Sequence, residues 1–437
     1  MIDIKSSSDR VKSFYEIVRE TRDEVVFIVG GGILQIPFID EVYKNGYIPV
    51  VFDINSNAPA FKKYSEDKII KAVISTKAEE ECLDFAVQVA RQHKPVACAT
   101  VGTDFSRTVA KIANRLNLPG NPYGVALATT NKGIMRTKLS EKGIPQPVFC
   151  VVEDFSQFLE SIRQMNRDYY VVKPADNMGA RGVQLVNKEF SKEELRKIFE
   201  TAFQYSTDKK VIVEEYIKSY ELSADALVVD KKVHITGIAD RFILNPPNFI
   251  ELGHLMPSVL PADLVSAASD IFIRAIEALG IVQGAAKGDI RVRYENDSNG
   301  KKVARAYIGE VASRLSGGFM SAYTYPYATG VNLMKLMLDV ALGKKDIKVN
   351  SQWNFYSCEL GLVSKKDGVL KRVENTYDAL CVPYIKNVFI LREENEKVVK
   401  TCNNVSKLGN VISQAPMANL AVKYCKKALS MLKPIYK

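Results

Sequence analysis

The sequence predicts a multidomain protein of mixed α/β and α+β class, with a doubly wound parallel sheet at the N-terminus and a β-rich C-terminal region. Three observations carry this prediction. At 437 residues the chain exceeds the size of one ordinary core, so two to four domains are expected. Residues 24–120 alternate between strand-like and helix-like segments, which is typical of a parallel sheet. Beyond residue 346 most apolar runs are short and strand-like.

Taken in order, the N-terminal segments predict three strands separated by helices. The strands are expected at 24–30, 47–53 and 95–102, and the helices at 31–46, 80–94 and 104–118. Further helices are predicted at 131–143, 156–165, 191–205, 262–280 and 318–343, with strands at 148–152, 169–174, 183–186, 211–217 and along 222–256. Ser191 and Glu194 form a capping box for one of these helices. The C-terminal strands are predicted at 353–363, 387–395 and 397–401, before a helix at 417–432.

The composition narrows the classes of function. The net charge is +10, but the basic residues are spread along the chain without an aromatic-interleaved stripe, so no nucleic-acid groove is expected. No window approaches 18 consecutive apolar residues, which argues against a membrane span. The seven cysteines lack a CxxC pair, and the first residues are too polar for a signal peptide. We therefore expect a cytoplasmic protein with some attraction for small anionic substrates such as nucleotides.

The most informative residues are two acids, Asp289 and Glu310, in strand-like runs on either side of Asn299-Gly300. Asn-Gly is the strongest short-range signal for a two-residue hairpin turn, and such a turn places Asp289 directly opposite Glu310. Like charges so placed destabilise a sheet unless a cation lies between them, and Mg²⁺ is typically held by one or two carboxylates plus substrate phosphates. A longer loop over 295–301 would shift the pairing, and two solvated acids on an exposed hairpin are the alternative interpretation.

Two glycine-rich segments follow expected strands. The strand ending near Lys173 leads into a loop with Gly179 and Gly182, where backbone N–H groups can approach phosphate oxygens. This loop lacks the P-loop pattern, and an ordinary glycine hairpin is the competing interpretation. The glycines at 30–32 suggest a dinucleotide turn, but the third glycine of that fingerprint falls at Gln35, which argues against NAD or FAD.

Taken together and in order, several segments resemble the ATP-grasp superfamily, in particular its biotin carboxylase-like branch and its amino-acid ligases. The segments are NKGIMRTKL, KPADNMGARGV, EEYI followed by Glu221, GDIRV, and EVASRLSGG. Each is weak alone, but five in this order are specific. The resemblance implies a pre-ATP-grasp α/β domain over 1–120, an ATP-grasp domain over 121–345 with a mobile lid at about 145–215, and a C-terminal β-rich domain over 346–437.

The resemblance also implies roles in binding ATP and Mg²⁺, with Mn²⁺ as an alternative ion. Lys132 and Lys173 match the two phosphate-contacting lysines. The flap over the triphosphate matches Met178, Gly179, Ala180, Gly182 and Val183. The hinge that reads adenine matches Glu214, Glu215, Tyr216 and Ile217, and Glu221 matches the acid near the ribose. Asp289 and Glu310 match the two metal carboxylates.

For the second half of the reaction, Arg314 matches the arginine that meets the acyl phosphate or the substrate carboxylate, and with Lys173 it forms the implied catalytic pair. The implied second-substrate pocket contains Glu251, His254, Ser258 and Gly317. A buried histidine satisfied by its neighbours is the alternative for His254. The sequence departs from the family pattern at Asp289, where Glu is commoner, and at Ala312, where Asn is usual. These departures leave open whether one metal ion or two are bound.

The implied function is an ATP- and Mg²⁺-dependent carboxylate–amine ligase, which forms an amide or peptide-like bond through an acyl phosphate on amino-acid-type substrates. One alternative is activation of bicarbonate or formate, as in carbamoyl-phosphate or purine-pathway relatives. Another is a nucleotide-binding regulatory protein without turnover. The expected partners are small carboxylate and amine substrates, and a homodimer is left open.

Overall fold

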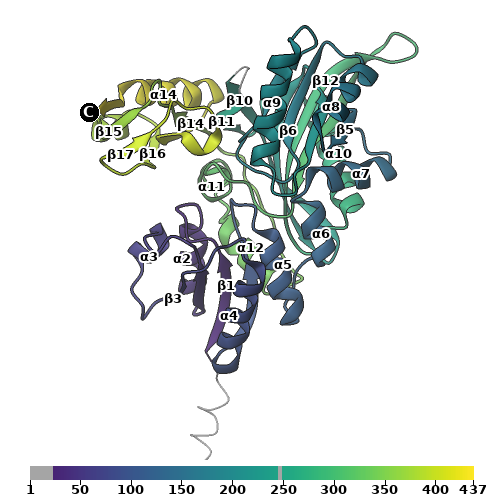
Figure 1. The fold of residues 1–437 in the computed structure, drawn as a ribbon. Helices are drawn as coiled ribbons and strands as arrows, with labels where there is room; N and C mark the ends of the chain where they lie inside the picture. The colour runs from purple at the N-terminus through teal and green to yellow at the C-terminus, as the bar shows by residue number, and fades with distance from the viewer. Residues whose placement is uncertain (1–22, 245–248) are drawn as a thin grey trace, which may run out of the picture.

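The computed structural model describes residues 23–244 and 249–437, and its strands form four sheets. Figure 1 shows three lobes, which are purple, teal and yellow from the N-terminus to the C-terminus. The prediction that the first residues are not a signal peptide concerns residues 1–22, which lie outside the described residues. Residues 245–248, part of the predicted strand run at 222–256, also lie outside them. In the part of the chain that is described, no helix is long and apolar enough to cross a membrane.

The N-terminal lobe contains a parallel sheet, as predicted, but the sheet has four strands rather than the three that were expected. In spatial order its strands are β3 (Ile70–Ala72), β2 (Ile48–Phe52), β1 (Glu24–Val29) and β4 (Lys94–Ala99). The helices of this region are α2 (Ile36–Lys44), α3 (Pro59–Lys63), α4 (Glu79–Gln92) and α5 (Ser106–Arg115).

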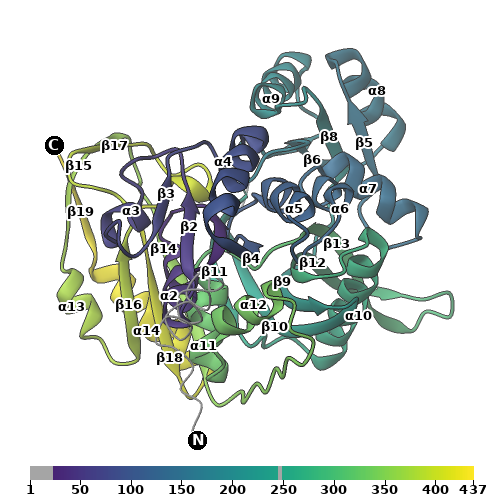
Figure 2. The ribbon, with the colours of Figure 1, turned by 90° about the horizontal axis from the view of Figure 1, so that it is seen from below.

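Helices cover both faces of this parallel sheet, which makes it doubly wound. Along β1, Val26 and Ile28 belong to the core that includes α2, whereas Val25, Phe27 and Val29 belong to the core that includes α4 and α5. Figure 2 shows α4 and α5 on one side of the purple strands and α2 on the other. Because both faces are covered, β1 is apolar along its length rather than alternating.

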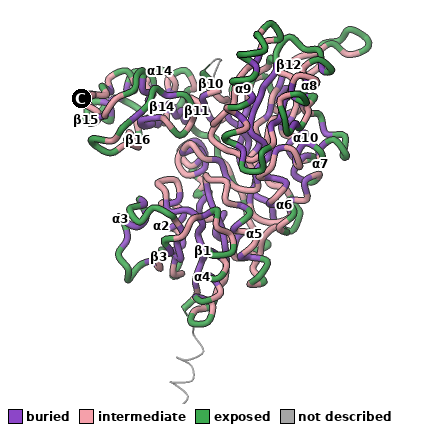
Figure 3. The backbone as a smooth tube through the Cα atoms, viewed as in Figure 1, coloured by how far each residue is buried: buried purple, intermediate pink, exposed green. Residues whose placement is uncertain are grey.

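The second sheet has eight strands and runs from the central lobe into the C-terminal lobe. In spatial order the strands are β13 (Lys302–Ala312), β12 (Gly284–Asn296), β9 (Tyr220–Val229), β10 (Lys232–Leu244), β11 (Ile250–Met256), β14 (Tyr356–Leu362), β18 (Gly409–Ala415) and β16 (Ile385–Ile390). Its associated helices are α6 (Tyr123–Ala128), α7 (Lys132–Glu141), α10 (Ala262–Leu279), α11 (Tyr325–Thr329) and α12 (Leu333–Ala341). Figure 3 shows that burial is concentrated along the strands at the centre of the lobes. Three strands from beyond residue 346 extend the same sheet, so the division into three domains stays a prediction.

A third sheet forms a layer separate from the central one (Figure 2). Its antiparallel strands are β5 (Phe149–Val152), β8 (Val211–Glu215), β6 (Tyr169–Pro174) and β7 (Gln184–Asn187), and it packs against α8 (Phe155–Met165) and α9 (Lys192–Tyr205). The predicted capping box at Ser191 and Glu194 is confirmed at the start of α9. This layer carries the glycine loop between β6 and β7.

The last sheet is small and lies in the C-terminal lobe. Its strands are β17 (Glu396–Val398), β15 (Gly368–Glu374) and β19 (Lys433–Tyr436), and the helices nearby are α13 (Thr376–Leu380) and α14 (Ala418–Met431). The helix predicted over 318–343 is wrong as one element: a π-helical turn at Met320–Thr324, α11 and α12 replace it. The break arises because Gly330 takes a φ of 75°, and Asn332 then caps α12 by accepting a hydrogen bond from the N–H of Lys335.

The junction between β11 and β14 depends on a glycine. A Cβ placed on Gly253 would lie 1.8 Å from the backbone oxygen of Glu359 on β14. Gly253→Ala is therefore expected to force these strands apart and to lower the free energy of unfolding by about 3 kcal/mol. Urea unfolding of both proteins measures this change. Gly124→Ala is the matched control, because nothing lies within 4 Å of a Cβ built there; equal loss in the two variants would contradict the prediction.

Candidate active site

The β12–β13 hairpin places Asp289 directly opposite Glu310, which confirms the predicted pairing. The next pair is Ile290 with Ile308, so Gly309 is an extra residue in β13 and forms a bulge. A Cβ on Gly309 would lie 3.0 Å from the backbone oxygen of Asp289, and glycine permits this close approach. The two acids therefore meet across a bulged pair of strands.

The turn of the hairpin differs from the two-residue prediction. Asn296 pairs with Lys302, so the loop spans residues 297–301, close to the longer loop that was left open. The side chain of Asp297 accepts hydrogen bonds from the N–H groups of Asn299 and Lys301, each at 2.9 Å. This local cap outweighs the Asn-Gly preference. The longer loop shifts the strand pairing by one residue, and the bulge at Gly309 reverses this shift. Asp289 is therefore still opposite Glu310, as predicted.

Three cations surround the acid pair. Lys287 and Arg241 both contact Asp289, with the Arg241 nitrogen 3.2 Å from Oδ1, and Lys132 Nζ lies 3.1 Å from Glu310 Oε1. Burial raises the pKa of each acid, but Arg241 and Lys287 at Asp289, and Lys132 and Lys287 at Glu310, outweigh it and hold both pKa values below the usual range. Both carboxylates are therefore ionised at neutral pH.

The donor set fits a hard divalent cation that is completed by a ligand. Asp289 Oδ1 is buried, and none of its contacts in the described structure has hydrogen-bond geometry. Glu310 keeps 32% of its side chain exposed, so an ion can reach it. Among residues 23–244 and 249–437 no group of three or more His, Cys, Asp and Glu could hold a metal ion by itself. One or two carboxylates with phosphate oxygens supplying the rest is the usual arrangement for Mg²⁺.

A second charge cluster lies between α7 and the β5–β8 sheet. Glu214 Oε1 lies 2.7 Å from Arg136 Nε, and Glu214 Oε2 lies 2.7 Å from Lys173 Nζ, with all three side chains buried. Burial would raise the pKa of Glu214, but the two cations lower it to about 2. Burial lowers the pKa of Lys173. The structure thus gives the Glu214 side chain a role in positioning Lys173, while its predicted part in reading adenine stays a prediction.

The rest of the predicted hinge follows β8 directly. Tyr216 lies under the guanidinium of Arg291, 5.4 Å from the ring centre, and Arg291 also donates to the backbone oxygen of Ile217 at 3.0 Å. Glu215 accepts a hydrogen bond from Arg167 at 2.9 Å. These contacts fix the backbone at 215–217. The structure brings this segment close to Glu221, because Arg291 lies 3.0 Å from a Glu221 oxygen.

Arg241 on β10 connects three of the predicted site acids. Its guanidinium lies 2.8 Å from Glu251, 3.2 Å from Asp289 and 3.4 Å from Glu221. The candidate ribose acid, metal acid and second-substrate acid therefore share one buried cation. The sequence did not identify Arg241 because it lies on a strand without a recognisable motif.

The glycine loop spans residues 175–183 and adopts left-handed backbone at Gly179, Ala180 and Gly182, with φ values of 72°, 59° and 70°. Lys132 Nζ donates to the backbone oxygen of Asn177 at 2.7 Å, so this lysine touches both the loop and Glu310. Met178 and Val183 lie at the two ends of the turns. Lys132 therefore links the start of the loop to Glu310, while the role of residues 178–183 as a flap stays a prediction.

Two of the predicted second-substrate residues, Glu251 and His254, lie around Gly318. His254 Nδ1 lies 3.3 Å from Glu359 Oε2, and His254 Nε2 lies 3.7 Å from Glu251 Oε2. A Cβ on Gly318 would approach Glu251, His254 and Glu359 within 3.3 to 3.5 Å. The absence of a side chain there leaves these three groups close to the backbone of the 314–318 segment. Glu359 was missed by the sequence analysis because it comes from β14, a hundred residues away.

Arg314 and Gly317 contact the N-terminal lobe. Arg314 Nε donates to Asp104 Oδ1 at 2.6 Å, and a Cβ on Gly317 would lie 2.8 Å from the oxygen of Gly102. Asp104 follows β4 at the carboxyl edge of the parallel sheet, where open α/β sheets usually bind ligands. Ser258 does not join this network: its hydroxyl donates to Asp240.

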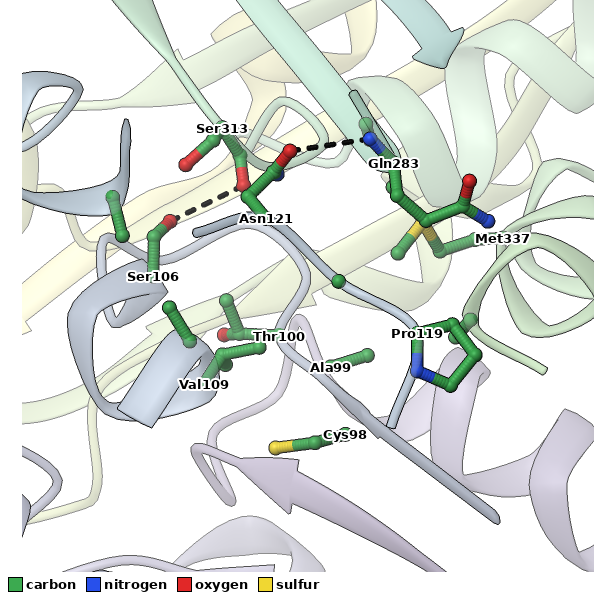
Figure 4. A pocket seen from close by; sticks show the side chains of 16 residues that line it. Cys98, Ala99, Thr100, Ser106, Val109, Pro119, Asn121, Gln283, Ser313 and Met337 are labelled. Carbon is green, nitrogen blue, oxygen red and sulfur yellow. Dashed lines mark hydrogen bonds between the residues drawn. The ribbon is translucent and has the colours of Figure 1, made fainter. Parts of the chain in front are cut away.

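A small cavity of about 40 Å³ lies beside this region, between the N-terminal and central lobes (Figure 4). In Figure 4, Ser106 donates to the backbone oxygen of Ser313, which links α5 of the N-terminal lobe to the central lobe. Asn121 accepts a hydrogen bond from the backbone N–H of Gln283. A cavity of this size holds about two or three waters and no nucleotide. It contains none of the predicted site residues. The candidate site is therefore the open charge cluster and not this cavity.

Comparison with known proteins identifies the framework around these residues. Residues 130–243 match the family model of the phosphoribosylglycinamide synthetase ATP-grasp (A) domain. Residues 130–243 therefore form an ATP-grasp domain. The solved structure of the L-amino acid ligase from Bacillus licheniformis aligns with a TM-score of 0.77 and 21% identity, and covers 95% of this ATP-grasp chain and 100% of that chain.

Curated relatives of this ATP-grasp chain match over shorter stretches. The D-alanine–D-alanine ligase of Gloeobacter violaceus is 30% identical over 189 residues, which are 41% of this chain and 60% of the relative. The alanine–anticapsin ligase of Bacillus subtilis is 25% identical over 287 residues, which are 60% of this chain and 57% of the relative. Across six curated relatives, the matched part is 20% to 66% of the relative's length. The comparisons therefore establish the fold and the ATP-grasp domain at residues 130–243, and they leave the reaction to be argued from the site.

Proposed function

We propose that this protein is an ATP- and Mg²⁺-dependent carboxylate–amine ligase that forms an amide or peptide-like bond between amino-acid-type substrates. One observation carries the proposal. Lys132, Lys173, Asp289, Glu310 and Arg314 lie close enough to influence one another's charges, in one partly exposed cluster within an ATP-grasp framework. Such a cluster has the charges that an ATP phosphate chain, a metal ion and a substrate carboxylate require.

The nucleotide would lie between the glycine loop and the acid pair. Lys132 and Lys173 are both buried, and they contact Glu310 and Glu214 respectively. Each ammonium group would turn from its carboxylate to the phosphate oxygens when the nucleotide binds. Asp289 and Glu310 would hold Mg²⁺, which neutralises phosphate charge when it is bound. Phosphoryl transfer depends mainly on such positioning and neutralisation, and asks little covalent chemistry of the protein.

Arg314 is the residue that we assign to the substrate carboxylate. Its guanidinium now binds the Asp104 carboxylate at 2.6 Å, and a substrate carboxylate can take the place of Asp104 with the same geometry. Held there, a carboxylate oxygen attacks the γ-phosphorus of ATP, which releases ADP and leaves an acyl phosphate. The glycine loop covers this step and keeps out water that would hydrolyse the intermediate.

The amine must lose a proton before it attacks the acyl carbon, and we assign His254 as the group that takes it. His254 is buried between the carboxylates of Glu251 and Glu359, which orient the ring. The new C–N bond forms as the C–O bond to phosphate breaks, and phosphate leaves with that oxygen. The products are an amide, ADP and phosphate.

His254→Asn is expected to lower kcat by about 100-fold or more, because it removes the proton acceptor while leaving ATP contacts in place. The KM for ATP should change by less than about threefold. Steady-state kinetics with the amine varied measures both constants. His234→Asn is the matched control, since His234 lies on β10, where it pairs with Leu227. An unchanged kcat in His254→Asn would show that another group accepts the proton.

The test of the proposed function is an ADP-release assay with Mg²⁺ and ATP across pools of amino acids and dipeptides. The ligase is expected to form ADP and phosphate only when an acid and an amine are both present, with a new amide detected by mass spectrometry. ADP formation with bicarbonate alone would replace the proposal with bicarbonate activation. Nucleotide binding without turnover across the pools would favour a regulatory protein.

A further inference from the structure

A short loop of the C-terminal lobe reaches back to the candidate active site. It comprises residues 402–407, between β17 and β18, and includes a 3₁₀ turn at Asn404–Ser406. Neither the predicted site residues nor the proposed mechanism includes any part of it. We call this segment the C-terminal loop.

The C-terminal loop is braced internally and from the adjacent strand end. The side chain of Asn403 accepts hydrogen bonds from the N–H groups of Val405 and Ser406, each at 3.0 Å. The guanidinium of Arg392 donates to the backbone oxygens of Val405 and Lys407. These bonds fix the backbone of the loop. Asn404 and Val405 are therefore held in place for their contacts with neighbouring segments.

On one side, the C-terminal loop touches the glycine loop. The N–H of Asn404 donates to the backbone oxygen of Gly179 at 3.0 Å. A Cβ on Gly179 would lie 2.9 Å from Val405 Cγ2, so the Val405 side chain presses directly on the glycine backbone. Both contacts act on the turn at Gly179.

On the other side, the C-terminal loop binds both backbone groups of Glu251 on β11. The N–H of Glu251 donates to Asn404 Oδ1 at 2.8 Å, and Lys407 Nζ donates to the backbone oxygen of Glu251 at 3.1 Å. The Lys407 side chain packs on Gly361, where a Cβ would lie 2.7 Å from Lys407 Cδ. Asn404 therefore bonds to the glycine loop through its backbone N–H and to β11 through its side chain.

We propose that the C-terminal loop is a strap that fastens the glycine loop to β11, with Asn404 as the positioning residue. A continuous set of contacts then runs from Gly179 through Asn404 and Glu251 to Arg241, and on to Asp289. Opening of the glycine loop must break the contacts made by Asn404 and Val405. The proposal rests on the proposed function in one respect, namely that a nucleotide is what the glycine loop covers.

Limited trypsin digestion tests the strap without using the ligase reaction. Arg181 lies in the glycine loop, and its peptide bond becomes accessible when the loop opens. Asn404→Ala removes the acceptor for the Glu251 N–H, and Val405→Gly removes the contact on Gly179. Each is expected to raise the cleavage rate after Arg181 by about fivefold, which is the effect of one typical hydrogen bond or small apolar contact. Mass spectrometry of timed samples, with and without Mg²⁺ and a non-hydrolysable ATP analogue, gives the rate.

Three matched variants sharpen the result. Asn404→Asp keeps an acceptor for the Glu251 N–H, so its cleavage rate is expected to stay within about twofold of the wild type. Asn419→Ala and Val399→Gly change exposed residues of the same lobe and are expected to leave the rate unchanged. Rates after Arg181 that match the wild type in both Asn404→Ala and Val405→Gly would overturn the proposal. An equal rise after Lys44 on the remote helix α2 would also overturn it, since that result reports general loosening.

A second readout separates the strap from the ligase assignment. If the strap holds the glycine loop closed during catalysis, Asn404→Ala is expected to raise amine-independent ADP formation relative to the complete reaction by about fivefold, because water enters more easily. An unchanged ratio in an active ligase would overturn this role of the strap. If no acid and amine pair supports turnover, the proposed function fails, while the trypsin result still decides whether the strap exists.

Discussion

Glu310→Gln is expected to lower ADP formation by about 100-fold or more while the protein remains folded. The substitution removes a negative charge that would face the metal ion, and it leaves Lys132 without its 3.1 Å partner. The ADP-release assay at several Mg²⁺ concentrations measures the effect. The required Mg²⁺ concentration is also expected to rise, because only Asp289 retains a carboxylate at the acid pair.

A matched acid on the same hairpin serves as the control for this prediction. Glu295 lies near the turn and contacts Arg293 and Tyr307, away from the acid pair. Glu295→Gln is expected to leave turnover within about twofold of the wild type. Wild-type turnover in Glu310→Gln would contradict the assignment of Glu310 as a metal ligand. It would also contradict the proposal that Asp289 and Glu310 hold Mg²⁺ together.

Glu214→Gln is expected to lower the free energy of unfolding by about 3–5 kcal/mol. The substitution leaves Arg136 and Lys173 buried without a counter-charge, where the wild-type contacts are both 2.7 Å. Urea unfolding at neutral pH measures the change. Glu200→Gln is the control, because its partner Arg196 is 4.0 Å away on an exposed face of α9 and the expected loss is below about 1 kcal/mol.

The difference in the free energy of unfolding between the wild type and Glu214→Gln is expected to depend on pH. The pKa of Glu214 is lowered from 4.5 to about 2 in the folded protein. A lowered pKa means that the stabilisation is fully present above pH 4.5 and is lost as the pH falls toward 2. The gap between wild type and Glu214→Gln is therefore expected to narrow over this window. A gap that stays constant down to pH 2 would contradict the assigned ion pairs.

Local sequence signals predicted the secondary structure near the site well, and the hairpin shows their limit. The register at Asp289 and Glu310 was correct although the turn was wrong. The Asp297 side chain set a longer loop, and the bulge at Gly309 restored the pairing. A glycine bulge depends on how the two strands pair, so it cannot be predicted from the turn residues alone.

Long-range contacts account for what the sequence could not supply. Arg241, Asp104 and Glu359 come from three separate strands or strand ends, and each meets a predicted site residue through tertiary packing. Motif spacing along the chain carries no information about these pairings. Glu214 illustrates the same point: its sequence position suggested nucleotide contact, while its buried side chain pairs with Arg136 from α7.

The most direct test of carboxylate activation follows an oxygen atom. Once the substrate screen has identified the acid, its carboxylate is labelled with ¹⁸O, and the phosphate released by the complete reaction is examined by mass spectrometry. The proposed reaction transfers one carboxylate oxygen to phosphorus, so each phosphate formed with an amide is expected to carry one ¹⁸O. Phosphate without ¹⁸O would show that water, and not the substrate carboxylate, attacks ATP, and would contradict the acyl-phosphate ligase.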